Sequence, residues 1–222
     1  MGIDYAQARE KMVDNQIRPN DVTDYGVLAR FLEVPREAFV PEAMVELAYI
    51  DDDIALLADG HERRYVLNPM SLAKLVQLAD PQQDEVVLDV GCGTGYSSAI
   101  LSGLCESVVA VESRMNLQEK AQQTLTELGC DNVVVLCGPL PDGCPAEAPY
   151  DLIFISASVE EVPDALLNQL KEGGRLVCIH GEGTAGQATK YIRTGDTFSR
   201  DLVSNAPGHP LPGFEREQAF TF

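Results

Sequence analysis

The segment from Leu88 to Tyr96 constrains the fold of this chain more than any other. It reads Leu-Asp-Val-Gly-Cys-Gly-Thr-Gly-Tyr, follows the apolar run at residues 86–88 and precedes a helical stretch near residues 97–104. Three glycines at a strand-to-helix turn let the chain turn sharply and let a ligand lie against bare backbone. The sequence therefore predicts a strand, a ligand-binding turn and a helix in succession.

From Glu85 onward, short apolar runs alternate with helical stretches. The strand-like runs are residues 86–88, 108–111, 133–136, 152–155 and 176–179, and the helical stretches lie near residues 97–104, 117–128 and 162–170. Runs rich in β-branched residues are typical of parallel strands that are buried on both faces. We expect an α/β fold with a doubly wound, mostly parallel seven-stranded sheet. Residues 190–193 and 214–222 are expected to close its far edge as an antiparallel pair.

The N-terminal third has a different, helical pattern. Helices are predicted over residues 5–17, 25–31, 41–47 and 69–78. We expect one domain over residues 1–222, with a helical cap at 1–80, a cofactor-binding core at 81–182 and C-terminal edge strands at 183–222.

Composition excludes several classes of function. Thirty-five acidic residues against 16 lysines and arginines give a formal net charge of -19, which disfavours a nucleic-acid partner because phosphate would be repelled. No run is long and apolar enough for a membrane span, and no leader-like segment opens the chain, so a cytoplasmic protein is expected. The six cysteines form no C-x-x-C pair and do not cluster with the three histidines, so we expect no metal site.

Spacing within the glycine turn indicates the kind of cofactor. A dinucleotide fingerprint, G-x-G-x-x-G, requires a small residue where this chain has Tyr96, whereas G-x-G-x-G is the methyltransferase form. Glu112 ends the next strand, roughly 20 residues past Gly91, where a carboxylate can accept hydrogen bonds from ribose hydroxyls. The predicted cofactor is S-adenosyl-L-methionine. Its expected contacts are Asp89, Gly91, Cys92, Gly93, Thr94, Gly95, Tyr96, Glu112, Ser113, Gly138, Pro139 and Leu140.

Beyond this turn, the chain resembles the protein-L-isoaspartate O-methyltransferases over most of residues 11–182. The shared segments include Val34-Pro35-Arg36-Glu37-x-Phe39-Val40-Pro41, Ala48-Tyr49-x-Asp51, Asn68-Pro69, Ala148-Pro149-Tyr150-Asp151 and Gly173-Gly174-Arg175-Leu176-Val177. The V-P-R-E-x-F-V-P segment is characteristic of that family. The resemblance implies a Rossmann-like class I methyltransferase fold and methylation of L-isoaspartyl carboxylates in damaged proteins.

Departures from the family pattern fall where the chemistry would take place. The family's Thr-Ile-Ser segment, whose serine is assigned to the active site, corresponds to Tyr65, Val66 and Leu67, so the serine hydroxyl is missing. The family's Gly-Asp-Gly, whose acid contacts the adenine region, becomes residues 138–140, the expected adenine wall. The acceptor cleft is expected at Tyr65, Val66, Leu67, Asn68 and Pro69. Catalytic residues are not identified, and the polar candidates are Asn68, Ser71, Ser156 and Ser158.

Three hypotheses about function remain open. The first is methylation of a carboxylate on a protein or peptide, most specifically an isoaspartyl residue. Because Leu67 and Pro139 depart from the family, the second hypothesis keeps the cofactor and changes the methyl acceptor. The third is a non-catalytic protein that binds S-adenosylmethionine. The acceptor pocket distinguishes them, and the sequence leaves oligomeric state and rate open.

Overall fold

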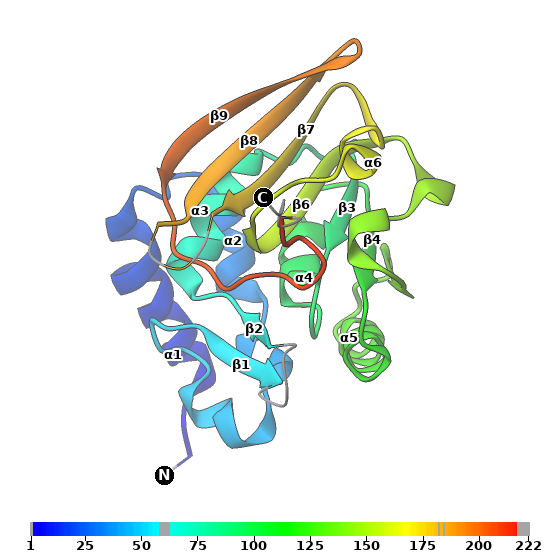
Figure 1. Cartoon of the computed structure of the whole chain (residues 1–222). Coiled ribbons are helices and arrows are strands. Elements are labelled where there is room, and N and C mark those ends of the chain that lie inside the picture. The colour runs from blue at the N-terminus through cyan, green and yellow to red at the C-terminus, as the bar shows by residue number, and fades with distance from the viewer. Residues whose placement is uncertain (1, 58–62, 182, 184, 217–222) are drawn as a thin grey trace, which may run out of the picture.

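A seven-stranded sheet organises the computed structural model, which describes residues 2–57, 63–181, 183 and 185–216 (Figure 1). The strand order is β5-β4-β3-β6-β7-β8-β9. Neighbours from β5 to β7 are parallel, and β8 and β9 add an antiparallel edge. The strands are β3 (Val86–Val90), β4 (Ser107–Glu112), β5 (Val133–Cys137), β6 (Tyr150–Val159), β7 (Leu170–His180), β8 (Gln187–Thr194) and β9 (Thr197–Asn205). The predicted mostly parallel seven-stranded sheet is confirmed.

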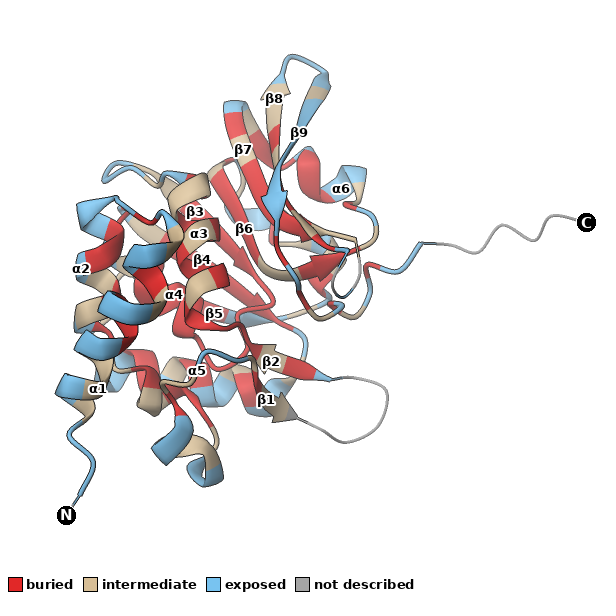
Figure 2. Ribbon diagram, turned by 90° about the vertical axis from the view of Figure 1, so that its left-hand side faces the viewer, coloured by how far each residue is buried: buried red, intermediate tan, exposed pale blue. Residues whose placement is uncertain are grey.

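Alternating strand residues supply two apolar cores, one on each face of the sheet. Val87 and Ala110 belong to one core, and Leu88 and Val109 belong to the other. Each face of a central strand is therefore covered, which explains why the runs read as continuously apolar rather than alternating. Figure 2 shows the buried central strands behind the helices, with the outer strand β9 largely exposed.

Helices cover the first face of the sheet. They are α1 (Tyr5–Met12), continued by a π-helical turn (Val13–Ile17), α2 (Tyr25–Glu33), α3 (Pro69–Ala79), α4 (Tyr96–Ser102) and α5 (Met115–Glu127). Short 3₁₀ turns lie at Arg18–Asn20, Arg36–Phe39 and Glu42–Leu47. The second face is covered by α6 (Asp164–Leu167), by a 3₁₀ turn at Leu140–Asp142, and by Cys144, Leu211 and Phe214; a further 3₁₀ turn lies at Pro145–Glu147 and is exposed. In the described residues, no helix is long and apolar enough to cross a membrane.

Three features differ from the sequence-based expectations. An antiparallel pair, β1 (Ile54–Leu57) and β2 (Arg64–Val66), lies in the predicted helical cap and was not predicted. The predicted helix near residues 162–170 is reduced to the single turn α6. The expected strand at residues 190–193 is confirmed within β8, but its antiparallel partner is β9; residues 214–216 lie outside any strand, and residues 217–222 are outside the described part.

Candidate cofactor and acceptor site

The glycine turn has the conformation that its sequence predicts. Gly91 and Gly93 lie between β3 and α4 with φ of 76° and 60°, in the left-handed region that side chains with a Cβ rarely adopt. The amide of Gly95 donates to the carbonyl of Cys92 at 2.9 Å, which closes the turn before α4 begins. The turn therefore presents bare backbone at the carboxyl end of the central strand.

Glu112 ends β4 beside this turn and is completely buried. Its Oε2 accepts the Gly93 amide at 2.9 Å, and its Oε1 accepts the Arg114 amide at 3.1 Å and the Ser113 hydroxyl at 3.3 Å. The carboxylate is thus held at the loop by backbone donors from both sides. The predicted juxtaposition of Glu112 with the glycine turn is present in the fold.

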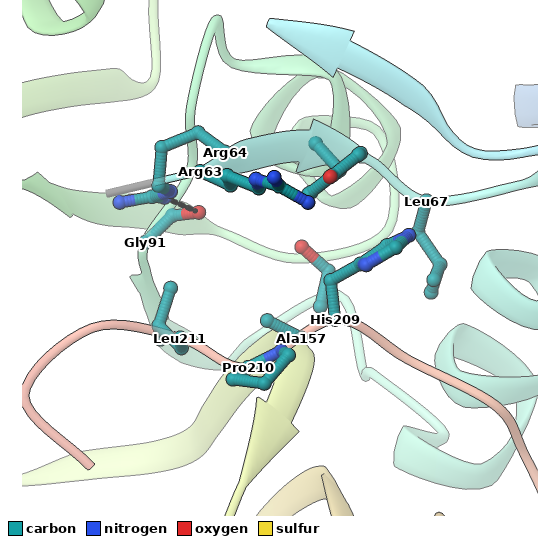
Figure 3. Close-up of a pocket in the computed structure, with 10 residues that line it drawn as sticks. Arg63, Arg64, Leu67, Gly91, Ala157, His209, Pro210 and Leu211 are labelled. Atoms are coloured by element: carbon teal, nitrogen blue, oxygen red, sulfur yellow. Dashed lines mark hydrogen bonds between the residues drawn. The ribbon is translucent and has the colours of Figure 1, made fainter. Parts of the chain in front are cut away.

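Arg64, from β2, binds the same carboxylate. Its Nη1 lies 2.9 Å from Glu112 Oε1 and its Nη2 lies 2.8 Å from Oε2, in the paired geometry that makes arginine–carboxylate contacts strong. Nη2 also donates to the Gly91 carbonyl at 2.8 Å, as the dashed line in Figure 3 marks. The arginine side chain is 4% exposed. Sequence reasoning missed Arg64 because it lies on an unpredicted strand, and the Arg63-Arg64 pair in an acidic chain was its only signal.

Other side chains of the chain lie over the glycines as well. A Cβ added at Gly91 would meet Leu211 Cδ1 at 2.9 Å, and one at Gly93 would meet Leu56 Cδ1 at 2.8 Å. The pocket between these segments has a cavity volume of about 20 Å³, enough for about one water molecule. Figure 3 shows Arg64, Gly91 and Leu211 around it.

The Glu112 carboxylate and the glycine turn fit S-adenosylmethionine, although neighbouring side chains occupy the space of the cofactor in this conformation. A carboxylate at a strand end beside a glycine turn suits two ribose hydroxyls and the adjoining chain of a nucleoside. The side chains of Arg64 and Leu211 occupy the face that a nucleoside would use. Cofactor binding at Glu112 therefore requires that both side chains move.

Asp89 lies within β3 and is completely buried. Its Oδ2 accepts the hydroxyls of Ser97 and Ser98 at 2.7 and 2.6 Å, whereas its Oδ1 has no hydrogen-bond partner among the described residues. Burial raises the pKa of Asp89 from 3.8 to about 6, and the two serine hydroxyls oppose that rise. The carboxylate ties β3 to the start of α4, and its Oδ1 is a buried acceptor without a hydrogen bond among the described residues.

Asp89→Asn is expected to change how stability depends on pH. Below the pKa of the unfolded chain, Asp89 is neutral in both the folded and the unfolded state. Between pH 3.8 and about 6, Asp89 is ionised in the unfolded chain but still protonated in the folded protein, so the wild type loses stability as pH rises. The loss is complete above the folded pKa and amounts to roughly 3 kcal/mol. Because asparagine does not titrate, the wild-type free energy of unfolding should fall by that amount relative to the variant between about pH 4 and pH 7. Urea unfolding at several pH values measures it, and a pH-independent difference would refute it.

The side chains within the turn contact the N-terminal helices. The Thr94 hydroxyl donates to the Phe39 carbonyl at 2.5 Å. The Tyr96 ring packs against Phe31 and Phe39, with centroids 6.2 and 5.5 Å away, and the Arg36 guanidinium lies 5.0 Å from its centroid. These two predicted cofactor contacts have side chains that anchor the turn to the N-terminal region.

The remaining predicted cofactor contacts lie near the loop but differ in exposure. The Cys92 side chain is buried, and burial raises the pKa of its thiol well above the ordinary value. The Gly138 amide donates to the Glu112 carbonyl at 3.1 Å, so the predicted adenine wall begins beside the carboxylate. Pro139 is exposed, whereas Leu140 is 1% exposed and belongs to the second core. Pro139 is therefore the solvent-facing member of this wall.

The predicted acceptor segment passes along the same pocket. Tyr65 and Leu67 line it, whereas Val66, which is as buried as Leu67, does not. Asn68 caps α3 by accepting the Ser71 amide at 2.9 Å, and Pro69 opens that helix. The missing family serine is thus replaced by an apolar side chain that still reaches the pocket.

The serine candidates do not converge on one point. Ser156 lines the pocket. The Ser158 hydroxyl donates to the Gly181 carbonyl, and its backbone pairs with residues 209 and 211, so it holds the C-terminal segment in place. The Ser71 hydroxyl is buried in α3 without a hydrogen-bond partner among the described residues. Ser156 is therefore the serine candidate that the structure places at the pocket.

His209 is a pocket residue that sequence reasoning missed. Its ring stacks on Tyr65 with centroids 3.6 Å apart and planes 9° apart, and its Nε2 lies 3.2 Å from Asp53 Oδ2. Asp53 Oδ1 accepts the backbone and side-chain amides of Asn68 at 2.6 and 2.9 Å. Asp53 thus links the C-terminal segment to the acceptor segment. The two are about 150 residues apart in sequence, so no local pattern could have joined them.

Known proteins are similar to this chain in sequence. A family model described as Protein-L-isoaspartate(D-aspartate) O-methyltransferase matches residues 7–204. Protein-L-isoaspartate O-methyltransferase 2 of Shewanella sediminis is 37% identical over 94% of this chain and 84% of the relative. Protein-L-isoaspartate O-methyltransferase of Herpetosiphon aurantiacus is 34% identical over 94% of this chain and 92% of the relative. The resemblance predicted from the sequence motifs is confirmed.

Solved structures agree with the fold. One named protein-L-isoaspartate O-methyltransferase superposes with a TM-score of 0.81 at 28% identity, covering 92% of this chain and 66% of that longer chain, so this chain spans about two thirds of it. A Plasmodium falciparum crystal structure in complex with S-adenosyl-L-homocysteine superposes with a TM-score of 0.72 at 18% identity over 95% of this chain, and it supports the fold alone.

Proposed function

Because this chain belongs to the protein-L-isoaspartate(D-aspartate) O-methyltransferase family, we propose that it is an S-adenosylmethionine-dependent enzyme that methylates the carboxylate of L-isoaspartyl residues in damaged proteins. The observation that supports S-adenosylmethionine as the cofactor is the buried Glu112 carboxylate beside the glycine turn, at the carboxyl end of β4. Membership of the family supports the isoaspartyl carboxylate as the methyl acceptor.

The proposed reaction requires the protein to position the acceptor and the cofactor, and it does not require a strong base. A carboxylate acceptor is already anionic at neutral pH, so it needs no deprotonation before it attacks a methyl group in line. When bound, S-adenosylmethionine supplies that methyl group on a sulfonium. Glu112 would hold the ribose, the backbone of Gly91 and Gly93 would lie against the cofactor, and the free oxygen of Asp89 would accept a hydrogen bond from it.

The charge of the pocket supports an anionic acceptor. Arg63, Arg64 and His209 line it, and none of its described lining residues is acidic, in a chain whose formal net charge is -19. Basic side chains thus line this pocket of an acidic protein, and Arg64 and His209, which pair with Glu112 and Asp53 in this conformation, can turn to a carboxylate ligand when those pairs open. The buried side chains of Leu67 and Leu211 line the same space with apolar groups.

The loss of the family serine favours a second candidate function. Leu67 offers no hydrogen bond to an acceptor, and hydrogen bonds to charged groups are worth roughly 1.5–3 kcal/mol. An enzyme with the same cofactor and a different acceptor, on a protein or on a small molecule, is therefore the alternative to isoaspartyl methylation.

Methyl transfer from labelled S-adenosylmethionine to an isoaspartyl peptide and to its aspartyl twin tests the proposal. We expect label on the isoaspartyl peptide alone, as a base-labile ester. Label on neither peptide, while calorimetry shows cofactor binding, would reject isoaspartyl methylation and favour another acceptor or a non-catalytic role. Label on both peptides would reject specificity for the isomerised residue.

We propose further that the enzyme is cytoplasmic and that its substrate is a protein or a peptide. All six cysteines are free thiols, which suits a reducing compartment. A nucleic-acid substrate does not suit the strongly acidic composition.

A further inference from the structure

We propose that Arg64 is the residue that binds the acceptor carboxylate, and that in the cofactor-free chain it is held by Glu112 instead. Cofactor and acceptor would then bind cooperatively through this one guanidinium. The inference rests on the proposed function, because it takes the acceptor to be a carboxylate.

The first step is a competition for Glu112. Both of its oxygens are engaged by Arg64, at 2.8 and 2.9 Å, and the pair is almost completely buried. Ribose hydroxyls would need the same two oxygens. Of the other donors to this carboxylate, the Gly93 and Arg114 amides belong to the backbone of the site and can stay, and the Ser113 hydroxyl reaches only Oε1, at 3.3 Å. Arg64 is therefore the donor that the cofactor must displace.

The second step follows from charge balance. A buried guanidinium without a counterion is strongly unfavourable, so a displaced Arg64 must reach another anion or bulk water. Displacement also removes its bond to the Gly91 carbonyl. Among the described residues that line the pocket, none offers a carboxylate. The nearby Asp53 already accepts from Asn68 and pairs with His209, and the buried Asp89 already accepts from Ser97 and Ser98. The proposed reaction brings two carboxylates to this pocket, that of the cofactor's methionine part and that of the acceptor, and the position of Arg64 in the chain favours the acceptor.

The third step is the position of Arg64 in the chain. It immediately precedes the acceptor segment, residues 65–69, and lines the same pocket as Leu67 and His209 (Figure 3). The planar guanidinium matches a carboxylate with two parallel hydrogen bonds. Arg64 would thereby supply the orienting donors that Leu67 lacks.

Calorimetric titration with S-adenosylhomocysteine tests both halves of the inference. Arg64→Gln removes the competitor, and Glu112 still accepts from Gly93 and Arg114. We expect the variant to bind S-adenosylhomocysteine at least tenfold more tightly than the wild type. An isoaspartyl peptide should tighten wild-type binding about fivefold or more, and this coupling should disappear in Arg64→Gln.

Two further variants make the result specific. Arg18→Gln removes the same charge from an exposed pair with Asp14 and should behave like the wild type. Arg64→Lys keeps the charge without the planar fork, and it should bind S-adenosylhomocysteine with intermediate affinity and show weakened coupling. Far-ultraviolet circular dichroism and thermal unfolding establish that each variant is folded.

The outcomes separate this inference from the proposed function. Unchanged S-adenosylhomocysteine affinity in folded Arg64→Gln and Arg64→Lys would overturn the displacement of Arg64. Equal coupling in the wild type and Arg64→Gln, or none in the wild type, would overturn its contact with the acceptor. Failure of the proposed function itself is read from the absence of methyl ester on the peptide, which requires no Arg64 variant.

Discussion

Glu112→Ala is expected to lower the affinity for S-adenosylhomocysteine by at least about a hundredfold and to destabilise the protein by roughly 3–5 kcal/mol. The affinity falls because two hydrogen bonds from the ribose to a charged acceptor are lost, each worth roughly 1.5–3 kcal/mol. Stability falls because Arg64, 4% exposed, is left buried without its counterion. Calorimetry and urea unfolding measure the two effects.

A double-mutant cycle separates the ion pair from other effects of the alanine. If the destabilisation comes from the unpaired Arg64, then Arg64→Leu should recover much of the stability in the Glu112→Ala background. It should recover none of the cofactor affinity. A Glu112→Ala protein that unfolds at the wild-type urea concentration would contradict the account of the buried pair. Retained cofactor binding would contradict the assignment of Glu112 to the ribose.

Tyr96→Ala is expected to destabilise the protein by roughly 3–5 kcal/mol, the usual cost of removing a large buried aromatic side chain. The ring is 2% exposed and fills the space between Phe31, Phe39 and Arg36, where the N-terminal helices meet α4. Thermal and urea unfolding measure the loss. Because the ring faces this core, the affinity of the folded variant for S-adenosylhomocysteine should change less than threefold.

Tyr96→Phe is the matched control. The buried hydroxyl interacts with the neighbouring Arg36 guanidinium, so its removal should change the free energy of unfolding by about 1 kcal/mol, far less than removal of the ring. A large loss of cofactor affinity in Tyr96→Phe, with stability unchanged, would return the Tyr96 side chain to the set of cofactor contacts that the sequence predicts. Equal stability of Tyr96→Ala and the wild type would contradict its role in the core.

The central sheet could be predicted from the sequence because parallel strands that are buried on both faces leave continuous apolar runs. Runs such as residues 108–111 and 152–155 are apolar throughout, since both faces of these strands are covered. The outer edge was harder to predict. In β9 most side chains are exposed, so the strand carries no apolar run, and its pairing with β8 follows from the hairpin instead. The hairpin of β1 and β2 was missed for a similar reason, because strands of three or four residues leave little periodicity.

The sequence by itself determined the glycine turn, the carboxylate at the end of the next strand and the family to which the chain belongs. These features are local: a glycine spacing, a strand length and short motifs. Only the tertiary structure decided which side chains meet at the pocket. Arg64 lies 48 residues before Glu112, and His209 lies at the far end of the chain from Tyr65, yet each pair is in contact. Such contacts depend on how separate elements pack, and no spacing along the chain encodes which buried charge will neutralise which.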